Sequence, residues 1–430
     1  MQHYIKISIL LCIYGVFKEF RPAEPYIVPY MTGPPLNFTA EQINHDIFPV
    51  STYSTMASLI VVFLITDLVR YKLIIILQSA CMIVSFFLLI YGRGVFQMQI
   101  EEIFYGLHMA GEVGYFTYIY AKVDNKHFQE VTSHVRSAYL VGKCLCGIVS
   151  QAVVYFDLIQ LQGLLWITIG SQIMALIWSV LLPSVDRSIY FHRNFTESDK
   201  TNEQHSGMTT HDWKTVGNYM RIDLKTAFTN VYVLKWAVWW ALATCCYYMV
   251  SAYCQVLWQV VREEAHATDI QYNGAVETVF TLLGALGAMI VGKAKVDWRG
   301  WGESLLAVGS LAMAALLYVT SRTSSEIIAY LTIIGLNIIF QIMITVANSE
   351  VAKNINRESY GLIFGITSLA VYIIRSIFSY IALQVYRLTI RVQFEAYAIY
   401  FGVLGVFFVI VMVLKCFRHK YNTKYSIHEK

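Results

Sequence analysis

The chain has 430 residues, of which 57% are hydrophobic and only 14% are charged, and its mean hydropathy is +0.52. Water-soluble domains usually carry about a quarter charged residues, so this composition excludes a soluble globular protein and predicts a chain that crosses a membrane several times. The formal net charge of +4 excludes little, because in a membrane protein the placement of Lys and Arg in the loops matters more than their sum.

Apolar runs of about twenty residues predict twelve membrane-spanning helices. Their expected limits are 6–31, 49–69, 72–92, 98–121, 132–156, 162–183, 232–260, 272–293, 301–320, 325–349, 359–385 and 393–415. One long polar stretch divides these spans six and six. We therefore predict an all-α membrane protein with an N-terminal six-helix bundle at 1–185, a cytosolic linker loop at 186–229, a C-terminal six-helix bundle at 230–417 and a cytosolic tail at 418–430.

Basic residues in the connections predict the orientation, because cytosolic loops of membrane proteins carry an excess of Lys and Arg. With both termini in the cytosol, the basic residues of the external connections are only Arg93, Arg262, Arg322, Arg387 and Arg391. Two Asn-Phe-Thr sequons fit this topology. Asn37 falls in the first external loop, where a glycan is expected, and Asn194 falls in the cytosolic linker, where glycosylation would contradict the prediction.

The predicted fourth span carries the most informative charge. Read at helical spacing, one face of this span holds Glu101, Tyr105, His108, Glu112 and Tyr115, and Glu112 falls near the middle of the membrane. An ionisable residue there costs at least about 2.5 kcal/mol on insertion scales, so it is tolerated mainly where it faces a partner or a watery cavity. Glu112 is therefore either a functional carboxylate in a cavity or half of a structural ion pair with another helix.

The predicted first span is interrupted by Pro22, Pro25 and Pro29, so its outer half cannot be a regular helix. Broken helices of this kind line cavities in transporters. Arg21 and Glu24 lie at the interruption with a spacing of three. That spacing fits a local ion pair as well as a role in gating or in binding a substrate.

Polar residues also follow one side of several later spans. They include Lys143 in the fifth span, Trp240 and Gln255 in the seventh, Asn273 and Glu277 in the eighth, Asn337 in the tenth and Arg375 in the eleventh. Hydrogen bonding between helices explains any one of these stripes. Together with the charge in the fourth span, they predict a central, partly polar cavity.

Motifs of soluble catalysis do not occur in the sequence. It has no phosphate-binding glycine loop, nucleotide fingerprint, His-Glu-x-x-His metal helix or nucleophile elbow. Its eight cysteines lie almost wholly in apolar runs, without the spacing of a metal site. We therefore expect no enzymatic activity, no cofactor, no metal and no nucleic-acid partner, and the lipid bilayer is the expected surrounding.

Several blocks of the sequence resemble the reduced folate and thiamine carriers of the major facilitator superfamily. The blocks are KEFRPAEPYIVPY (18–30), GPPLNFT (33–39), PVSTYS (49–54), TDLVRYK (66–72), FYGLHMAGEVGYFTYIYAKVD (104–124), KWAVWWALATCCYY (235–248) and YNGAVETVFTLLGA (272–285). The resemblance extends over nearly the whole chain apart from the central linker and the C-terminal tail. It implies the major facilitator fold, a location in the plasma membrane, and a substrate site between the two bundles near mid-membrane. It also implies that Asp67 and Arg70 help to latch the cytosolic side.

The same resemblance leaves the substrate open. At the position of Glu112, thiamine carriers have a glutamate and folate carriers an arginine, and a carboxylate in a cavity favours a cation such as thiamine. Arg375 is the folate-like feature, because folate carriers have a lysine there. Asn337 replaces an arginine that both groups tend to have, and Ser51 stands where thiamine carriers tend to have a tryptophan. An ion pair between Glu112 and Arg375 would leave neither residue diagnostic.

We therefore predict a secondary transporter of a water-soluble vitamin that works by alternating access, with thiamine favoured over a reduced folate or another heterocyclic solute. The sequence leaves the coupling ion open between a proton and an anion. His108 is a candidate proton carrier, and an ordinary hydrogen bond in the cavity is the favoured alternative for this residue. The alternative is a membrane receptor that kept the fold without transporting, which accumulation against a gradient would exclude. The expected substrate-binding residues are Glu112, Tyr115, Tyr105, His108, Glu24, Asn273, Glu277, Arg375, Lys143 and Trp240.

Overall fold

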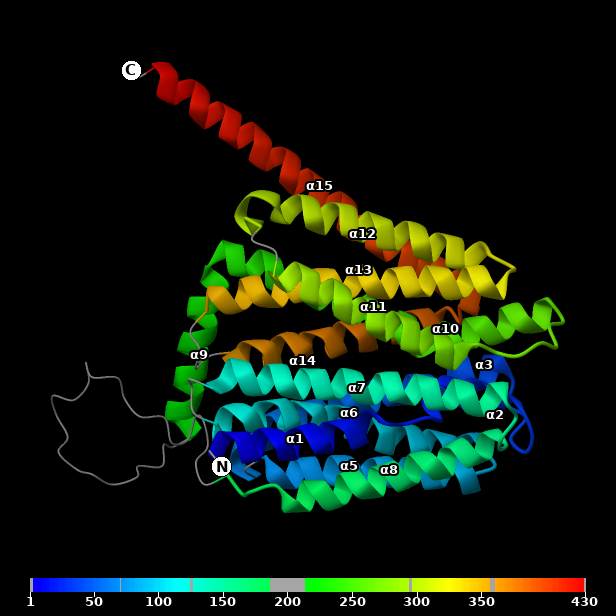
Figure 1. Cartoon of the computed structure of the whole chain (residues 1–430). Helices are drawn as coiled ribbons and strands as arrows, with labels where there is room; N and C mark the ends of the chain where they lie inside the picture. The colour runs from blue at the N-terminus through cyan, green and yellow to red at the C-terminus, as the bar shows by residue number, and fades with distance from the viewer. Residues whose placement is uncertain are drawn as a thin grey trace, which may run out of the picture.

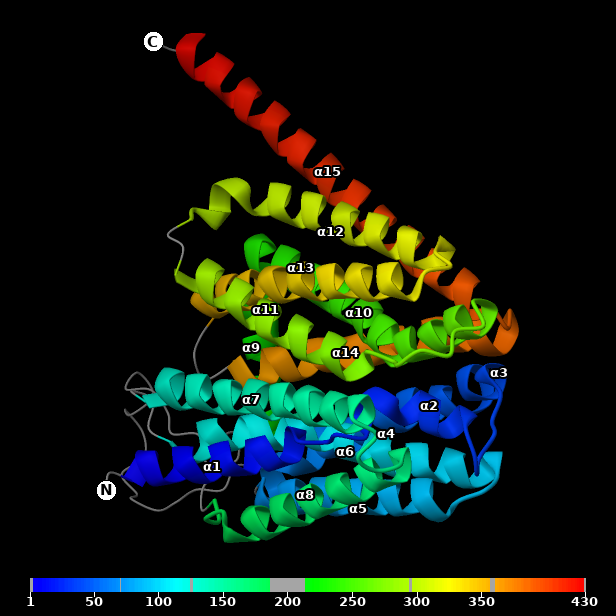
Figure 2. The same ribbon diagram turned by 45° about the vertical axis from the view of Figure 1, so that its right-hand side comes forward.

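The computed structural model describes residues 3–69, 71–123, 127–185, 213–293, 296–355 and 360–428. These residues form helices and short connections, and no strand occurs among them. Figures 1 and 2 show the helices side by side in two stacked groups, one from each half of the chain. The prediction of an all-α fold built from two helical bundles is confirmed.

Six spans form the N-terminal bundle. They are α1 (His3–Glu19), α4 (Phe48–Val69), α5 (Lys72–Tyr91), α6 (Val95–Lys122), α7 (Phe128–Tyr155) and α8 (Leu161–Leu181). α6 packs against both α4 and α5, and α1 packs against α7 and α8. The contact of α5 with α6 needs a small residue, since a Cβ added to Gly111 would lie 2.7 Å from the Cβ of Gln78. α6, which carries Glu112, is thus held firmly between its neighbours.

The first span breaks where the prolines predict. α1 ends at Glu19, and the chain continues through the short helices η1 (Glu24–Tyr26) and α2 (Ile27–Thr32). Proline has no backbone N–H and cannot continue a helical hydrogen-bond ladder, so carbonyl groups at the break are free for other donors. Two further short helices, α3 (Ala40–Gln42) and η2 (Ile43–Ile47), lead into α4.

Six spans likewise form the C-terminal bundle. They are α10 (Val231–Glu264), α11 (Asn273–Lys293), α12 (Trp298–Arg322), α13 (Glu326–Lys353), α14 (Tyr360–Ser379), which continues as η6 (Tyr380–Val385), and α15 (Ile390–His428). Within the described residues, nine helices of the two bundles are long and apolar enough to span a membrane. With α1, α4 and α6, which lie among them in Figure 1, they make up the twelve predicted spans.

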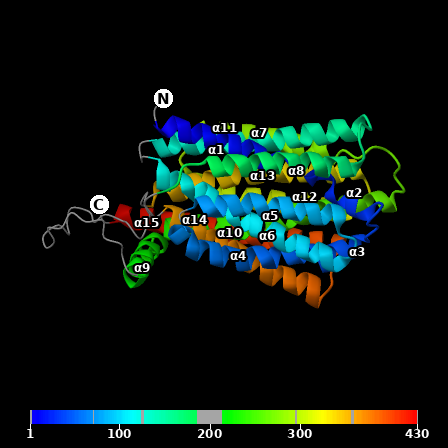
Figure 3. The ribbon, with the colours of Figure 1, turned by 90° about the horizontal axis from the view of Figure 1, so that it is seen from below.

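Two segments differ from the prediction. The last part of the predicted linker loop forms a helix, α9 (Trp213–Thr229), and α15 continues to His428 through the predicted tail. α9 repeats apolar residues at helical spacing, for example Trp213, Val216 and Met220. With 17 residues it is shorter than a typical membrane span of about twenty residues. Figures 1 and 3 show α9 at the end of the molecule where the N-terminus lies.

The two halves approach most closely where α7 meets α11. A Cβ added to Gly147 would lie 2.5 Å from the carbonyl oxygen of Gly274, and a Cβ added to Gly274 would lie 2.8 Å from the carbonyl oxygen of Gly147. Both distances are shorter than a real Cβ contact. Only glycine at both positions allows these two helices to touch backbone to backbone.

We expect the substitution Gly274→Val to lower the unfolding temperature of the purified protein. Overpacking of a tight contact typically costs about 1–3 kcal/mol, and here the added atoms would meet backbone. The matched control is Gly170→Val, because a Cβ at Gly170 meets nothing within 4 Å. Equal losses in the two variants would contradict the assignment of a close contact to α7 and α11.

Candidate functional site

Glu112 has an ion-pair partner on another helix. The ammonium of Lys18, near the end of α1, contacts the Glu112 carboxylate and also lies 2.7 Å from Oε1 of Glu19. The Lys18 and Glu19 side chains are 0% and 1% exposed, whereas that of Glu112 is 29% exposed. Both interpretations of Glu112 therefore hold in part, because its carboxylate is paired and yet remains accessible.

The charges continue along the broken first span. Nη2 of Arg21 lies 3.3 Å from Oε2 of Glu19, and Nη1 of Arg21 lies 2.7 Å from Oε1 of Glu24. The hydroxyl of Tyr105, on α6, donates to Oε1 of Glu24 at 3.4 Å. The local pair of Arg21 with Glu24 that the spacing predicts is thus present, as one step in a row of alternating charges that starts at Lys18.

One ion pair joins the two halves near the middle of the bundles. Nζ of Lys143 on α7 lies 3.6 Å from Oε1 of Glu277 on α11, and the side chains are 25% and 13% exposed. Both residues were expected at the substrate site. The structure places them together across the interface between the bundles, where each offsets the charge of the other.

The free carbonyl groups of the broken span accept hydrogen bonds from the other half. Nε2 of Gln255 donates to the Glu24 carbonyl at 2.9 Å, and Nδ2 of Asn273 donates to the Pro25 carbonyl at 2.9 Å. Asn273 is 4% exposed, and its Oδ1 accepts from the hydroxyl of Tyr330 at 2.7 Å. In this conformation Asn273 belongs to the closure between the halves.

More hydrogen bonds close the same end of the molecule. The hydroxyl of Tyr26 donates to the carbonyl of Gln271 at 3.1 Å, and Nε2 of Gln384 donates to the carbonyl of His45 at 2.7 Å. Hydrogen bonds and ion pairs also join other described residues of the two halves. They lie between the Lys143–Glu277 pair and this end of the molecule. The end is opposite to the one where α1 begins. We call this set of contacts the outer closure, because it lies at the end of the molecule away from both termini (Figure 1).

Two predicted site residues of α6 lie inside the N-terminal bundle. His108 is 1% exposed and its Nδ1 lies 2.9 Å from the carbonyl oxygen of Gln78. Tyr115 is 0% exposed and its hydroxyl donates to the carbonyl of Leu11 at 3.0 Å. The helical face that they share with Glu112 is therefore covered by α5 and α1 at these two positions.

Aromatic side chains of the C-terminal half contact the predicted site residues Asn337 and Trp240. Tyr247 stacks on Phe340 with ring centroids 3.8 Å apart and donates from its hydroxyl to Oδ1 of Asn337 at 2.5 Å. Trp240 is 8% exposed, and its ring centroid lies 4.7 Å from that of Phe364. These contacts give Asn337 and Trp240 structural partners within their own half.

Arg375 on α14 has an aromatic neighbour and no ion pair among the described residues. Its guanidinium carbon lies 5.9 Å from the ring centroid of Tyr372, and its Nε is buried without a hydrogen-bond partner. No carboxylate of the described residues lies within 4 Å of it. The ion pair of Glu112 with Arg375 that the sequence allowed is not formed, because Lys18 holds Glu112 instead.

The remaining predicted sites lie at the surface or outside the described part of the chain. Asn37 is exposed in the connection between α2 and α3, with a positive φ of 51°, which suits an asparagine. Arg70 and the side chain of Asp67 are outside the described residues, so the cytosolic latch stays a prediction.

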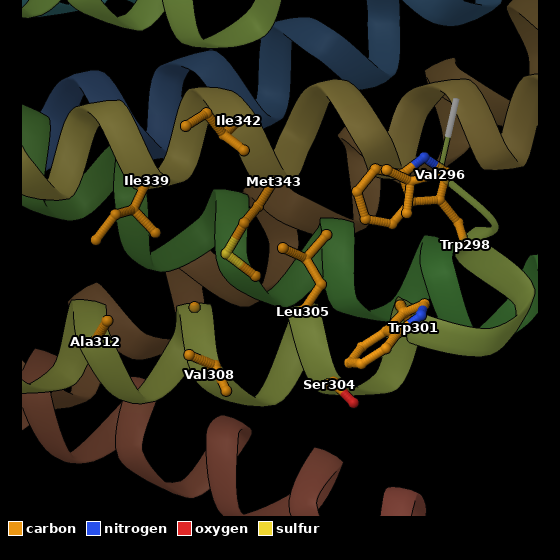
Figure 4. A pocket seen from close by; sticks show the side chains of 11 residues that line it. Val296, Trp298, Trp301, Ser304, Leu305, Val308, Ala312, Ile339, Ile342 and Met343 are labelled. Carbon is orange, nitrogen blue, oxygen red and sulfur yellow. The ribbon is translucent and has the colours of Figure 1, made fainter. Parts of the chain in front are cut away.

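An apolar groove lies apart from all of these residues. It has a volume of about 550 Å³ and runs between α12 and α13, where Trp298, Trp301 and Met343 are among its lining residues (Figure 4). None of the predicted site residues lines it, and its lining carries no charged side chain. The candidate site is therefore the charged region between the bundles.

Sequence reasoning missed Lys18 and Glu19 as members of the site. Both residues end the first apolar run directly before the proline break, and that position in the middle of an expected span was the available signal. It also assigned no role to Glu102, which is 7% exposed on α6. A charge in the middle of a membrane span needs a partner, but the sequence does not show which helix supplies that partner.

A family model described as Reduced folate carrier matches residues 2–397. Thiamine transporter 1 of Mus musculus is 34% identical over 453 residues, which cover 95% of this chain and 90% of the relative. Folate transporter 1 of Caenorhabditis elegans is 32% identical over 425 residues, which cover 96% and 93%.

Solved structures share the fold. The nucleoside transporter NupG matches with a TM-score of 0.60 and 12% identity over 95% of this chain and 99% of its own. The inward open conformation of the xylose transporter XylE from E. coli matches with a TM-score of 0.61 and 13% identity over 94% and 95%. At these identities the likeness concerns the arrangement of the helices.

The Lys143–Glu277 pair can be tested by exchange of its charges. Glu277→Gln removes the carboxylate that pairs with Lys143, which we expect to cost about 1–2 kcal/mol. The cost is less than for a fully buried pair because both side chains keep some exposure. The double exchange Lys143→Glu with Glu277→Lys should recover most of the loss in unfolding temperature. A double exchange no more stable than Glu277→Gln would contradict a direct pair.

Proposed function

This chain belongs to the reduced folate carrier family and is a transporter of its folate and thiamine group, and we propose that its substrate is a vitamin cation of the thiamine class. The observation that carries the proposal is the Glu112 carboxylate, which stays 29% exposed while the charged residues next to it are buried. An accessible carboxylate in a poorly solvated cavity favours a cation over an anion.

Aromatic rings around the carboxylate support the same class of substrate. Tyr372 of the C-terminal half shares an apolar cluster with Ala110, two positions before Glu112 on α6, and its ring centroid lies 5.9 Å from that of Tyr248. Tyr248 is 37% exposed. Tyrosine faces bind cations and stack on flat rings, and thiamine combines a positive charge with flat heterocycles.

We infer that the described conformation is closed on the outer side of the plasma membrane. Figures 1 and 3 show the N-terminus, α9 and the C-terminal end of α15 at one end of the molecule, and the basic linker and tail support a cytosolic location for that end. The outer closure lies at the opposite end. Transport by alternating access then requires these hydrogen bonds to open while the halves rock about the central site.

A reduced folate is the second candidate, and Arg375 is the observation that favours it. This guanidinium has no carboxylate of the described residues within 4 Å and has an unpartnered buried Nε. A carboxylate of a folate would provide the negatively charged hydrogen-bond acceptor that Arg375 lacks. Uptake of both vitamins by one protein would then use Glu112 and Arg375 separately.

The substrate is tested with Glu112→Gln, expressed in cells without their own vitamin carriers. We expect uptake of labelled thiamine to fall at least about tenfold, because a hydrogen bond to a charged group is worth about 1.5–3 kcal/mol. Uptake should also respond to external pH if a proton exchanges with the cation at this carboxylate. Surface expression is measured in parallel, with labelled reduced folate as the second solute.

Glu130→Gln is the matched control, because Glu130 is an exposed carboxylate on α7 of the same bundle. Thiamine uptake that survives Glu112→Gln would overturn the cation proposal. Folate uptake that is lost instead in Arg375→Gln would establish the second candidate, and accumulation of neither vitamin would contradict both.

A further inference from the structure

We propose that the Lys18 ammonium occupies the cation-binding part of the substrate site, and that a cationic substrate must displace it from Glu112. Lys18 would then set the preference of the carrier among charged solutes. The inference rests on the proposed function in one respect, namely that Glu112 recognises the charge of the substrate. It adds a residue that decides specificity without needing to touch the solute.

The surroundings of the Lys18 ammonium have the composition of a cation-binding site. Its Nζ contacts the carboxylate of Glu112 and lies 5.1 Å from the ring centroid of Tyr115 and 5.7 Å from that of Tyr139. A carboxylate together with two aromatic faces is the arrangement that binds ammonium groups of ligands. In this conformation the protein fills the arrangement with its own side chain.

Displacement of Lys18 from Glu112 would leave no buried charge alone. The Lys18 ammonium is shared with Glu19, whose Oε1 lies 2.7 Å away, so it keeps one carboxylate when a substrate takes the other. Glu19 in turn has Arg21 as a second partner at 3.3 Å. Because a buried charge without a partner is strongly unfavourable, this shared pairing is what makes an exchange at Glu112 feasible.

Access to the pair comes from one side. The Lys18 side chain is 0% exposed and that of Glu112 is 29% exposed, so a solute that reaches the pair meets the carboxylate and not the ammonium. A cation would therefore compete with Lys18 for Glu112, and the competition weakens cation binding. An anion at Arg375 would not meet Lys18, because Arg375 lies on α14 of the other half and has no carboxylate of the described residues within 4 Å.

The experiment compares thiamine binding to the purified full-length protein and to the variant Lys18→Met. We expect Lys18→Met to bind thiamine at least tenfold more tightly, because the competing cation is gone. Glu19→Gln should act in the opposite direction and weaken thiamine binding, since Lys18 then has Glu112 as its one remaining carboxylate. In the double variant Lys18→Met with Glu112→Gln, the gain should disappear.

Lys235→Met is the matched control. Lys235 also pairs with a carboxylate, that of Glu303, at 2.6 Å, and its Nζ lies 4.8 Å and 5.3 Å from the ring centroids of Tyr232 and Trp236. It lies on α10 of the other half, however, and its partner lies on α12. We expect Lys235→Met to leave thiamine affinity unchanged. Tighter binding in both lysine variants would overturn the proposal, because it would not be specific to Glu112.

Unfolding temperatures of all variants separate binding effects from loss of fold. Folded Lys18→Met that binds thiamine no more tightly than the wild type overturns the role of Lys18, while loss of binding in Glu112→Gln still supports the proposed function. If Glu112→Gln binds thiamine as well as the wild type, both proposals fail. If Lys18→Met binds thiamine and the wild type does not, the result supports the inference even when the wild type transports no thiamine.

Discussion

A charge placed inside a membrane has to be paired, and the pairing on which this structure depends is the contact of Lys18 with Glu112 and Glu19. It joins α1 to α6, with the Lys18 side chain fully buried and the Glu112 side chain 29% exposed. Removing one member of such a pair costs more than the pair itself contributes. The position of the broken first span relative to the centre of α6 is therefore specified by charge as well as by apolar packing.

The parts of the fold that depend on local chemistry could be predicted from the sequence. Apolar runs of span length identify the twelve helices, and the prolines after Arg21 predict the break, because both signals lie within the segment that they describe. The ion pair of Arg21 with Glu24 is equally local. α9 escaped prediction since it is an amphipathic helix of 17 residues, shorter than a span and without a continuous apolar run.

The site could be predicted only in outline, because its contacts join distant parts of the chain. Periodicity identifies the polar face of α6, but it does not show that Lys18, 94 positions earlier, lies opposite Glu112. It also cannot show that the same face is covered near His108 by α5 and near Tyr115 by α1. A long helix meets different neighbours along its length, so residues of one face do not share one environment.

The charge network and the outer closure are built on the same short segment. Glu24 takes part in both, since its carboxylate pairs with Arg21 and its carbonyl oxygen accepts from Gln255 of the other half. Proline chemistry accounts for this double use, because the break that places charged side chains at mid-membrane also frees the carbonyl groups that the closure needs. A change of partner at Arg21 would therefore act on the residue whose carbonyl group helps to hold the two halves together. On this geometry, occupation of the site and opening of the closure would both act on the same short segment after α1.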